Sequence, residues 1–413
     1  MRILVILACA LIGLFGGPAR AQAPITIGFG MALTGGLAPI GKAALLAMQI
    51  WAEEVNAKGG MLGRQVKLIY YDDQSNPSTV PGIYTKLLDV DKVDLVVSGY
   101  ATNMVAPAMP VMMQHNRMFL SLFGLAVNTE FNYPNYFSFT PTGGPQPKQS
   151  FSKGFFEVAM QQTPKPQTIA LVGADAEFPH NALDGARTLA KQAGLKIVYD
   201  KSYPPSTTDY TPIIRAIQAS EPDLVFVASY PPDTVGMLRA AHEVGLKTKL
   251  FGGGMVGLQS TAIKAQLGPL LNGIVDYDFW LPWASFATPE AKAFLKVYQS
   301  RAGAAGVDAL GYYIPPFAYG YLQVLQQAVE GTKSLDQDKL ADYMRTHTFK
   351  TTAGDIKFAP GGEWAEAQVM EVQFRGLQNN EVSQFTDPGT EVILWPPKDK
   401  TGSVVYPYTD AQH

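Results

Sequence analysis

Cysteine is almost missing from this 413-residue chain, which has a single one, Cys9. It lies within residues 1–21, a segment that we expect to be removed, so the mature protein would have no disulfide and no thiol. That excludes a disulfide framework and a cysteine nucleophile. A protein without thiols suits an oxidising compartment such as a periplasm.

Residues 1–21 have the pattern of a cleaved signal peptide. Arg2 is the charged start, an apolar stretch follows, and Ala19-Arg20-Ala21 is a small-residue cleavage motif. The apolar stretch is shorter than the roughly 20 residues of a membrane span. We therefore expect cleavage after Ala21 and export to the periplasm. Cys9 offers the alternative of a lipoprotein signal, but a better cleavage site follows it.

Charge and long apolar runs are also scarce. Charged residues make up 16% of the chain, the formal net charge is −3, and no Lys/Arg cluster stands out, which argues against nucleic acid as a partner. No stretch after residue 21 is apolar for long enough to cross a bilayer. The five histidines have no metal-ligand spacing, and no G-x-S-x-G, H-E-x-x-H or Ser-His-Asp arrangement is present. We expect no metal, no cofactor and no catalysis.

The chain does contain a regular alternation of short apolar strands and amphipathic helices. This βα rhythm predicts an α/β protein with parallel, doubly wound sheets, and the length predicts two lobes. The expected strands are 25–30, 65–71, 93–98, 117–123, 167–173, 195–200, 223–229, 248–252, 368–374 and 391–395. The expected helices are 41–58, 78–90, 107–115, 147–162, 180–193, 209–219, 233–244, 288–301, 313–330 and 336–346.

Three irregular stretches interrupt the rhythm: residues 135–147, 273–280 and 354–358. We interpret them as three crossovers between the lobes, which would act as a hinge. The expected N-terminal lobe is 22–140 plus 281–350. The expected C-terminal lobe is 141–280 plus 351–413.

Two similar stretches mark the expected ligand cleft. Residues 92–103 (KVDLVVSGYATN) read as a buried strand, a glycine turn and a helix start, and residues 221–230 (EPDLVFVASY) repeat the Asp-Leu-Val, the apolar run and the final tyrosine. Ligands bind beyond the carboxyl ends of strands in such sheets, and a helix N-terminus there suits an anion. Two facing units would clamp a small molecule. Either stretch alone could simply be a buried strand.

The chain resembles the branched-chain amino acid-binding family of periplasmic type I solute-binding proteins of ABC transporters. The resemblance covers nearly the whole mature chain. It is carried by residues 31–35 (MALTG), 55–64 (VNAKGGMLGR), 71–73 (YDD), 222–223 (PD) and 238–245. It implies a periplasmic protein, expected to be a monomer, that binds a small molecule between its lobes and delivers it to an inner-membrane ABC permease.

The resemblance also implies positions for ligand contacts. The residues implied to contact the ligand are Thr102 with the neighbouring Ala101, the small residues Gly124 and Ala126, the second-lobe aromatic positions Phe178 and Tyr230, and Ile40 in the side-chain pocket.

Two departures from the family pattern point to another ligand class. Ala126 replaces a hydroxyl, and Gly254 stands at or near the position of the acid that would pair with an ammonium group. Burying an unpaired charge costs several kcal/mol. The remaining residues at expected strand exits are apolar or aromatic, namely Tyr100, Phe123, Phe178, Tyr230 and Met255. We therefore favour an aromatic carboxylate of the hydroxybenzoate, phenylacetate or hydroxycinnamate type, as in the aromatic-acid branch of the family.

Other interpretations stay open at this point. The alternative ligand within the family is a branched-chain or other aliphatic amino acid, or an amide. An extracytoplasmic sensor module would bind the same ligands but usually needs a fused signalling segment. An enzyme such as an amidase would need a nucleophile–base pair. His180 follows Phe178 closely and could donate to the ligand, or serve as a surface or cap residue.

Overall fold

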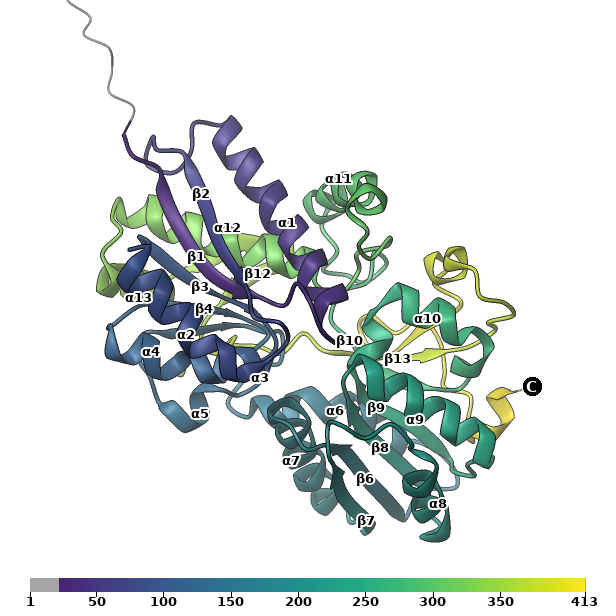
Figure 1. Cartoon of the computed structure of the whole chain (residues 1–413). Coiled ribbons are helices and arrows are strands. Elements are labelled where there is room, and N and C mark those ends of the chain that lie inside the picture. The colour runs from purple at the N-terminus through teal and green to yellow at the C-terminus, as the bar shows by residue number, and fades with distance from the viewer. Residues whose placement is uncertain (1–21, 413) are drawn as a thin grey trace, which may run out of the picture.

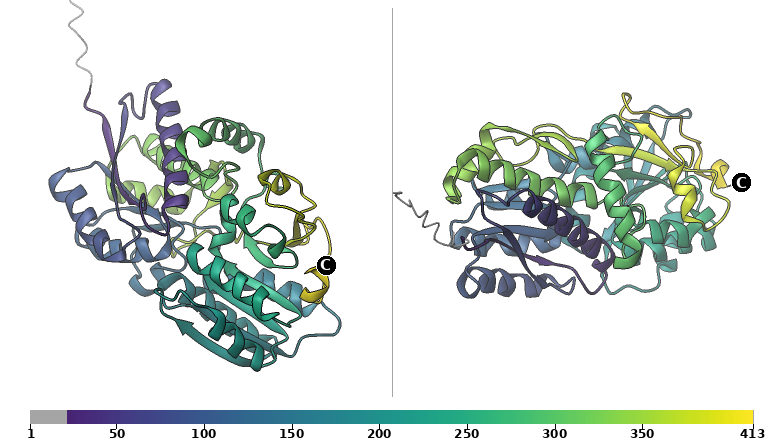
Figure 2. Two further views of the ribbon diagram at one scale, coloured as in Figure 1. Left: turned by 45° about the vertical axis from the view of Figure 1, so that its right-hand side comes forward. Right: turned by 90° about the horizontal axis from the view of Figure 1, so that it is seen from above.

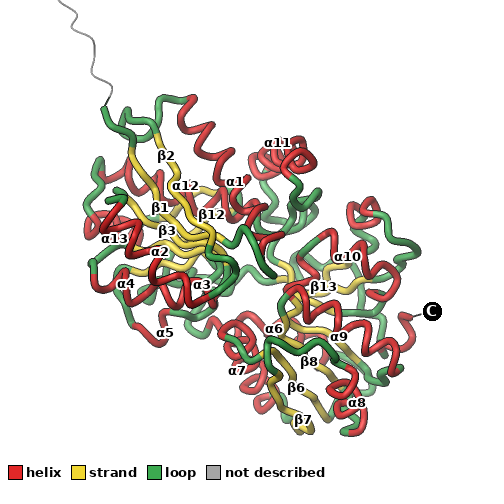
Figure 3. Tube along the Cα trace, in the orientation of Figure 1, coloured by secondary structure: helices red, strands yellow, loops and turns green. Residues whose placement is uncertain are grey.

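Two β-sheets, each covered by helices, build two lobes that face each other (Figures 1 and 3). The structure is a computed structural model that describes residues 22–412. The expected signal peptide, with Cys9 and the cleavage motif, lies outside the described residues. The two-lobed α/β architecture expected from the strand–helix alternation is confirmed.

The first sheet has five parallel strands in the order β2-β1-β3-β4-β5. Its strands are β1 (Ile25–Met31), β2 (Val66–Asp72), β3 (Leu95–Tyr100), β4 (Phe119–Leu122) and β5 (Tyr136–Phe139). All six residues of β3 are buried, because both faces of the sheet are covered by helices. The strand order reverses between β1 and β3, which places a crevice beyond the carboxyl ends of these strands.

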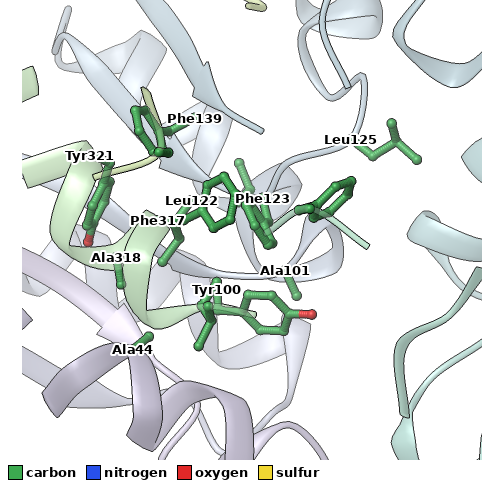
Figure 4. Packing of buried hydrophobic residues seen from close by; sticks show 14 of the residues in the cluster. Ala44, Tyr100, Ala101, Leu122, Phe123, Leu125, Phe139, Phe317, Ala318 and Tyr321 are labelled. Carbon is green, nitrogen blue, oxygen red and sulfur yellow. The ribbon is translucent and has the colours of Figure 1, made fainter. Parts of the chain in front are cut away.

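Helices cover both faces of this first sheet (Figure 2). They are α1 (Ala38–Ala57), α2 (Val80–Thr85), α3 (Thr102–Val105), α4 (Met109–Gln114), α5 (Asn128–Phe131), α11 (Pro289–Ala305), α12 (Pro315–Thr332) and α13 (Gln337–Thr346). The long helices α1 and α12 pack against each other. The aromatic side chains of α12 then fill the space above the sheet, and Phe317 lies beside Phe123 (Figure 4).

The second sheet has seven strands in the order β14-β13-β10-β9-β8-β6-β7. They are β6 (Thr168–Ala174), β7 (Lys196–Tyr203), β8 (Leu224–Ser229), β9 (Leu250–Met255), β10 (Val275–Asp278), β13 (Met370–Phe374) and β14 (Glu391–Trp395). Its helices are α6 (Pro147–Met160), α7 (Glu177–Gln192), α8 (Thr211–Ala219), α9 (Pro231–Val244) and α10 (Thr261–Leu267). Strands β13 and β14 run antiparallel, so the sheet is parallel only from β6 to β10.

The chain passes between the two sheets three times within residues 22–412. The passages follow β5, β10 and the small hairpin β11 (Thr348–Thr351)–β12 (Gly354–Lys357). Two details differ from the sequence-based expectation. Residues 136–139 are a strand of the first sheet, so the first passage starts after them. Residues 354–357 pair with β11, which packs on α12, so the third passage follows at 358–369. The domain limits at 140, 280 and 350 stay a prediction.

Among residues 22–412, no helix combines the length and the apolar character that a bilayer span requires. The same residues contain no group of three or more His, Cys, Asp or Glu side chains placed to hold a metal ion.

Candidate ligand-binding site

A small cavity, here called the inner cavity, lies between the lobes at the carboxyl ends of β3 and β4. Side chains from both sheets and from the passages between them line it: Tyr100, Ala101, Thr102, Phe123, Leu125, Thr140, Thr142, Phe151, Phe178, Tyr230, Val256, Tyr277, Phe279 and Tyr313. No charged side chain is among them. Its volume is about 30 Å³, which is room for one or two water molecules.

Unusual backbone conformations bring the first-lobe residues to this cavity. Ala101, between β3 and α3, has φ 92°, and Phe123 and Ala126, after β4, have φ 59° and 56°. Residues with a Cβ atom rarely adopt such angles, and strained positions of this kind concentrate at functional sites. Gly99 precedes Ala101 and must be glycine, because a Cβ there would lie 2.0 Å from the carbonyl oxygen of Gly30.

Aromatic rings from both lobes pack around the cavity. Phe123 from the first lobe has its ring centroid 5.2 Å from that of Phe279 and 5.3 Å from that of Tyr313. On the second-lobe side, Phe151 lies 4.8 Å from Tyr277 and 5.4 Å from Phe178. Edge-to-face and tilted arrangements dominate, as the ring quadrupoles prefer. Figure 4 shows Tyr100 and Phe123 side by side at this end of the first sheet.

Three tyrosine hydroxyls form a chain in this aromatic wall. The Tyr313 hydroxyl lies 3.1 Å from that of Tyr100 and 3.2 Å from that of Tyr277. Burial raises the pKa of all three phenols above the ordinary value, so they stay neutral and keep their protons. Three protons serve two mutual hydrogen bonds, which leaves one proton for another acceptor.

A second space, here called the outer cleft, opens on the other side of Tyr230. It measures about 620 Å³, and its walls include Leu37, Ser75, Asn103 and Pro107 from the first lobe and Asp175, Glu177, Tyr210, Pro232 and Asp233 from the second. Carboxylates but no Lys or Arg line it. Burial raises the pKa of Asp233, although a 2.6 Å hydrogen bond donated by the Tyr203 hydroxyl opposes that shift.

Tyr230 separates the two spaces, because its side chain lines both. Its hydroxyl donates a 2.8 Å hydrogen bond to Oδ1 of Asn103 in the opposite lobe. A second bond between the lobes runs from Nδ2 of Asn181 to the carbonyl oxygen of Leu125, at 3.0 Å. Tyr230 and Leu125 both line the inner cavity, so in this structure hydrogen bonds join the lobes directly beside it.

The structure brings six of the eleven expected site residues together. Tyr100, Ala101, Thr102, Phe123, Phe178 and Tyr230 all line the inner cavity.

The other five expected residues do not line the inner cavity. Ile40 lines a separate small cavity with Ser260. The Met255 side chain packs into another part of the second lobe's core. Gly124 and Ala126 lie beside the cavity wall as part of the loop after β4, and the Gly124 N–H donates to Oγ1 of Thr140.

Gly254 has a structural reason for lacking a side chain. A Cβ there would lie 2.9 Å from Cε1 of Phe151, so the ring of Phe151 occupies the space that an acid at this position would fill. The nearest buried acid along β10 is Asp276, whose Oδ1 accepts a 2.9 Å hydrogen bond from the Met255 N–H. Asp276 does not line the inner cavity.

Eight lining residues were missed from the sequence, namely Leu125, Thr140, Thr142, Phe151, Val256, Tyr277, Phe279 and Tyr313. Four of them lie in the irregular stretches 135–147 and 273–280, which were recognised as passages between lobes. Passages between lobes must run beside the cleft, so the polar and aromatic residues within them were a usable signal. Phe151 and Tyr313 gave no such signal. Phe151 lies near the start of the long helix α6, and Tyr313 lies just before the long helix α12.

His180 does not line either space. Its Nε2 lies 2.9 Å from Oδ1 of Asp175, and both side chains are about half exposed or more.

Comparisons with known proteins agree on one family. The family described as "Periplasmic binding protein" matches residues 24–376. A leucine-, isoleucine-, valine-, threonine- and alanine-binding protein of Pseudomonas aeruginosa is 23% identical over 349 residues, which are 84% of this chain and 89% of that protein.

Solved structures share the fold at lower identity. A branched-chain amino acid transporter substrate-binding protein from Streptococcus pneumoniae, in complex with isoleucine, superposes with a TM-score of 0.72 at 19% identity, over 93% of this chain and 100% of that chain. A solute-binding protein of an ABC transporter from Rhodopseudomonas palustris HaA2, in complex with p-hydroxybenzoic acid, gives 0.72 at 21% identity, over 86% and 94%.

Proposed function

We propose that this chain, which belongs to the family of periplasmic binding proteins, binds a small aromatic carboxylate of the hydroxybenzoate, phenylacetate or hydroxycinnamate type. The family consists of solute-binding proteins of ABC transporters. We further propose that residues 1–21 direct export and that the mature chain acts as a monomer and delivers its ligand to an inner-membrane permease.

The observation that carries the ligand proposal is the wall of the inner cavity. Eight of its fourteen lining residues are Phe or Tyr, and they come from both lobes. Each well-placed aromatic pair contributes about 0.5–1.5 kcal/mol beyond simple burial. A flat ring held between such walls would therefore gain energy from both lobes at once, which an aliphatic chain would do less well.

The polar groups of the inner cavity favour an acceptor on the ligand. Neutral hydroxyls of threonine and tyrosine line it, and the N–H group of Thr102 stands at the start of α3, where a helix has no internal acceptor for it. A carboxylate accepts from such donors. An ammonium group would need a carboxylate partner, and none lines this cavity.

The inner cavity must widen to admit the ligand. A volume of about 30 Å³ cannot hold a benzene ring, whereas the outer cleft beyond Tyr230 measures about 620 Å³. Separating the lobes, which breaks the bond from Tyr230 to Asn103, would join the two spaces, and the bond would form again when the lobes close around a ring that has displaced part of the aromatic packing. The ligand would then shift the protein toward a closed form with the ring between Phe123, Phe178 and Tyr230.

One observation favours the alternative ligand, an aliphatic amino acid. Glu177 and Asp233 line the outer cleft on the far side of Tyr230, where they could pair with an ammonium group if Tyr230 moved. The Pseudomonas aeruginosa relative is named for binding such amino acids. The two ligand classes thus differ in which space would hold their charged group.

A thermal-shift panel on residues 22–413 tests the proposal. The aromatic arm is 4-hydroxybenzoate, phenylacetate and 4-hydroxycinnamate, and the amino acid arm is leucine, valine and leucinamide. A ligand at 100 times its Kd adds about 2.7 kcal/mol of stability. We expect at least one aromatic acid to raise the Tm and no amino acid to do so. Stabilisation by leucine or valine, with no effect of the aromatic acids, would contradict the proposal.

A further inference from the structure

Thr142 has a buried hydroxyl that the fold does not use. The residue is fully buried in the first passage between the lobes, and its Oγ1 has no hydrogen-bond partner among the described residues. The side chain lines the inner cavity. A buried hydroxyl without a partner destabilises the protein, so this one needs an explanation.

The backbone around Thr142 holds it firmly in place. The carbonyl oxygen of Pro141 accepts a 2.7 Å hydrogen bond from the N–H of Gln368, and the N–H of Gly144 donates to the carbonyl oxygen of Trp364 at 2.7 Å. The first and third passages therefore lie side by side. The hydrogen bonds that join them involve residues before and after Thr142 in the sequence. A hydroxyl fixed in this way is preorganised to meet a group that enters the cavity.

Two more threonine hydroxyls line the same cavity, and both already act as acceptors. Oγ1 of Thr102 accepts a 3.1 Å hydrogen bond from the Leu125 N–H, and Oγ1 of Thr140 accepts from the Gly124 N–H at 2.9 Å and from the Ser138 hydroxyl at 2.8 Å. Neither of the two donates to a described residue. Both lone pairs of the Thr140 hydroxyl are therefore engaged and it can only donate toward the cavity, whereas Thr102 keeps its proton and one lone pair.

We propose that the hydroxyl of Thr142 binds an oxygen acceptor of the ligand, together with the protons of Thr102 and Thr140. This inference rests on the proposed function and deepens it, because it assigns the ligand's acceptor group to a set of three threonines that spans the first lobe and the first passage. Thr142 contributes most to specificity, since its hydroxyl is the one that makes no bond within the described protein. A carboxylate has about four lone-pair sites on its two oxygens, so it can accept a hydrogen bond from all three hydroxyls.

The test compares Thr142→Val with Thr142→Ser, using calorimetric titration with 4-hydroxybenzoate and with leucine and a melting curve without ligand. Valine keeps the shape and removes the hydroxyl. We expect Thr142→Val to weaken binding of the ligand that the wild type accepts by about tenfold or more, while the unliganded Tm stays the same or rises. Thr142→Ser should bind within about threefold of the wild type.

Thr248→Val is the matched control. Its Oγ1 donates a 2.8 Å hydrogen bond to the Asp223 carbonyl oxygen, far from both spaces, so this variant should lose Tm without losing affinity. Unchanged affinity in Thr142→Val, or a fall in its unliganded Tm like that of Thr248→Val, would overturn the inference.

The outcome separates the inference from the proposed function. If the wild type binds leucine and not 4-hydroxybenzoate, and Thr142→Val still weakens leucine binding tenfold, Thr142 keeps its role and the ligand class is wrong. If the wild type binds 4-hydroxybenzoate and Thr142→Val binds it equally well, the ligand class stands and the inference fails.

Discussion

At the scale of single residues, several buried polar side chains carry a cost that the fold alone does not offset. Thr142 is one, and Glu363 in the third passage is another. Burial raises the pKa of the Glu363 carboxyl to about 8, and neither of its oxygens has a hydrogen-bond partner among the described residues. Its neutral form is therefore the one that the folded protein favours.

Glu363 gives a pH-dependent prediction. Its folded-state pKa lies above the ordinary 4.5, so the native state holds a proton that the unfolded chain releases, and stability falls as the pH rises from about 4.5 to about 8. Glu363→Gln removes this loss. The Tm of Glu363→Gln minus the Tm of the wild type should be larger at pH 9 than at pH 5, and scanning calorimetry measures this difference. Glu366→Gln, an exposed neighbour, should show no such change, and an equal Tm difference at both pH values for Glu363→Gln would refute this reasoning.

At the scale of elements, a buried ion pair ties the far edge of the second sheet to its helices. Nζ of Lys264 on α10 lies 2.9 Å from Oε2 of Glu391 on β14, and both side chains are at most 4% exposed. Asp278 at the end of β10 belongs to the same group, since burial and the nearby Glu391 raise its pKa well above the ordinary value. Asp278 directly precedes Phe279, which lines the inner cavity, so this network supports the second passage.

Removing one partner of this pair should be strongly destabilising. We expect Lys264→Met to lower stability by about 3–5 kcal/mol, because Glu391 stays buried without its cation. The double variant Lys264→Met with Glu391→Leu should recover most of the loss, since a well-packed apolar pair often replaces a buried ion pair at no cost. Chemical denaturation measures both. Equal stability of the single and double variants would show that the loss does not come from leaving Glu391 buried without its cation.

The sequence predicted most elements because the hydrophobic period is strong in long helices and buried strands. The helix expected at 147–162 and the strand expected at 391–395 match α6 and β14 closely. Strand β5 was missed because its four residues lie within the irregular stretch 135–147, shortly before Pro141. The pairing of β12 with β11 was missed because short hairpins carry little periodicity.

The candidate site was predictable only in part, for a related reason. Residues at strand exits, such as Tyr100 and Tyr230, follow from the topology of parallel sheets. Met255 was expected in the cleft for the same reason, yet its side chain points into the core, because the pattern of a strand does not fix the direction of its last side chain. Tyr313 enters the cavity from a distant part of the chain, and only tertiary packing brings it there.

At the scale of the whole molecule, the two lobes meet through few direct bonds around the inner cavity. The hydrogen bond from Tyr230 to Asn103 is one of them, and Tyr230 lies between the inner cavity and the outer cleft. Because this bond forms only when the lobes are close, it contributes to the closed form and not to an open one.

This bond should therefore couple to ligand binding. We expect Tyr230→Phe and Asn103→Ala each to weaken binding by a few-fold, because each loses the same closed-state hydrogen bond, worth about 0.5–1.5 kcal/mol. The double variant should be no weaker than the more affected single variant. Calorimetric titration in a double-mutant cycle measures the coupling. Strictly additive effects would show that the bond does not contribute to closure.

We have proposed that the aromatic inner cavity takes the ring of an aromatic acid. The most direct measurement is mass spectrometry of the small molecule that stays with the protein through purification and is released on unfolding. We expect a single-ring aromatic acid. Release of leucine, valine or another aliphatic amino acid would contradict it.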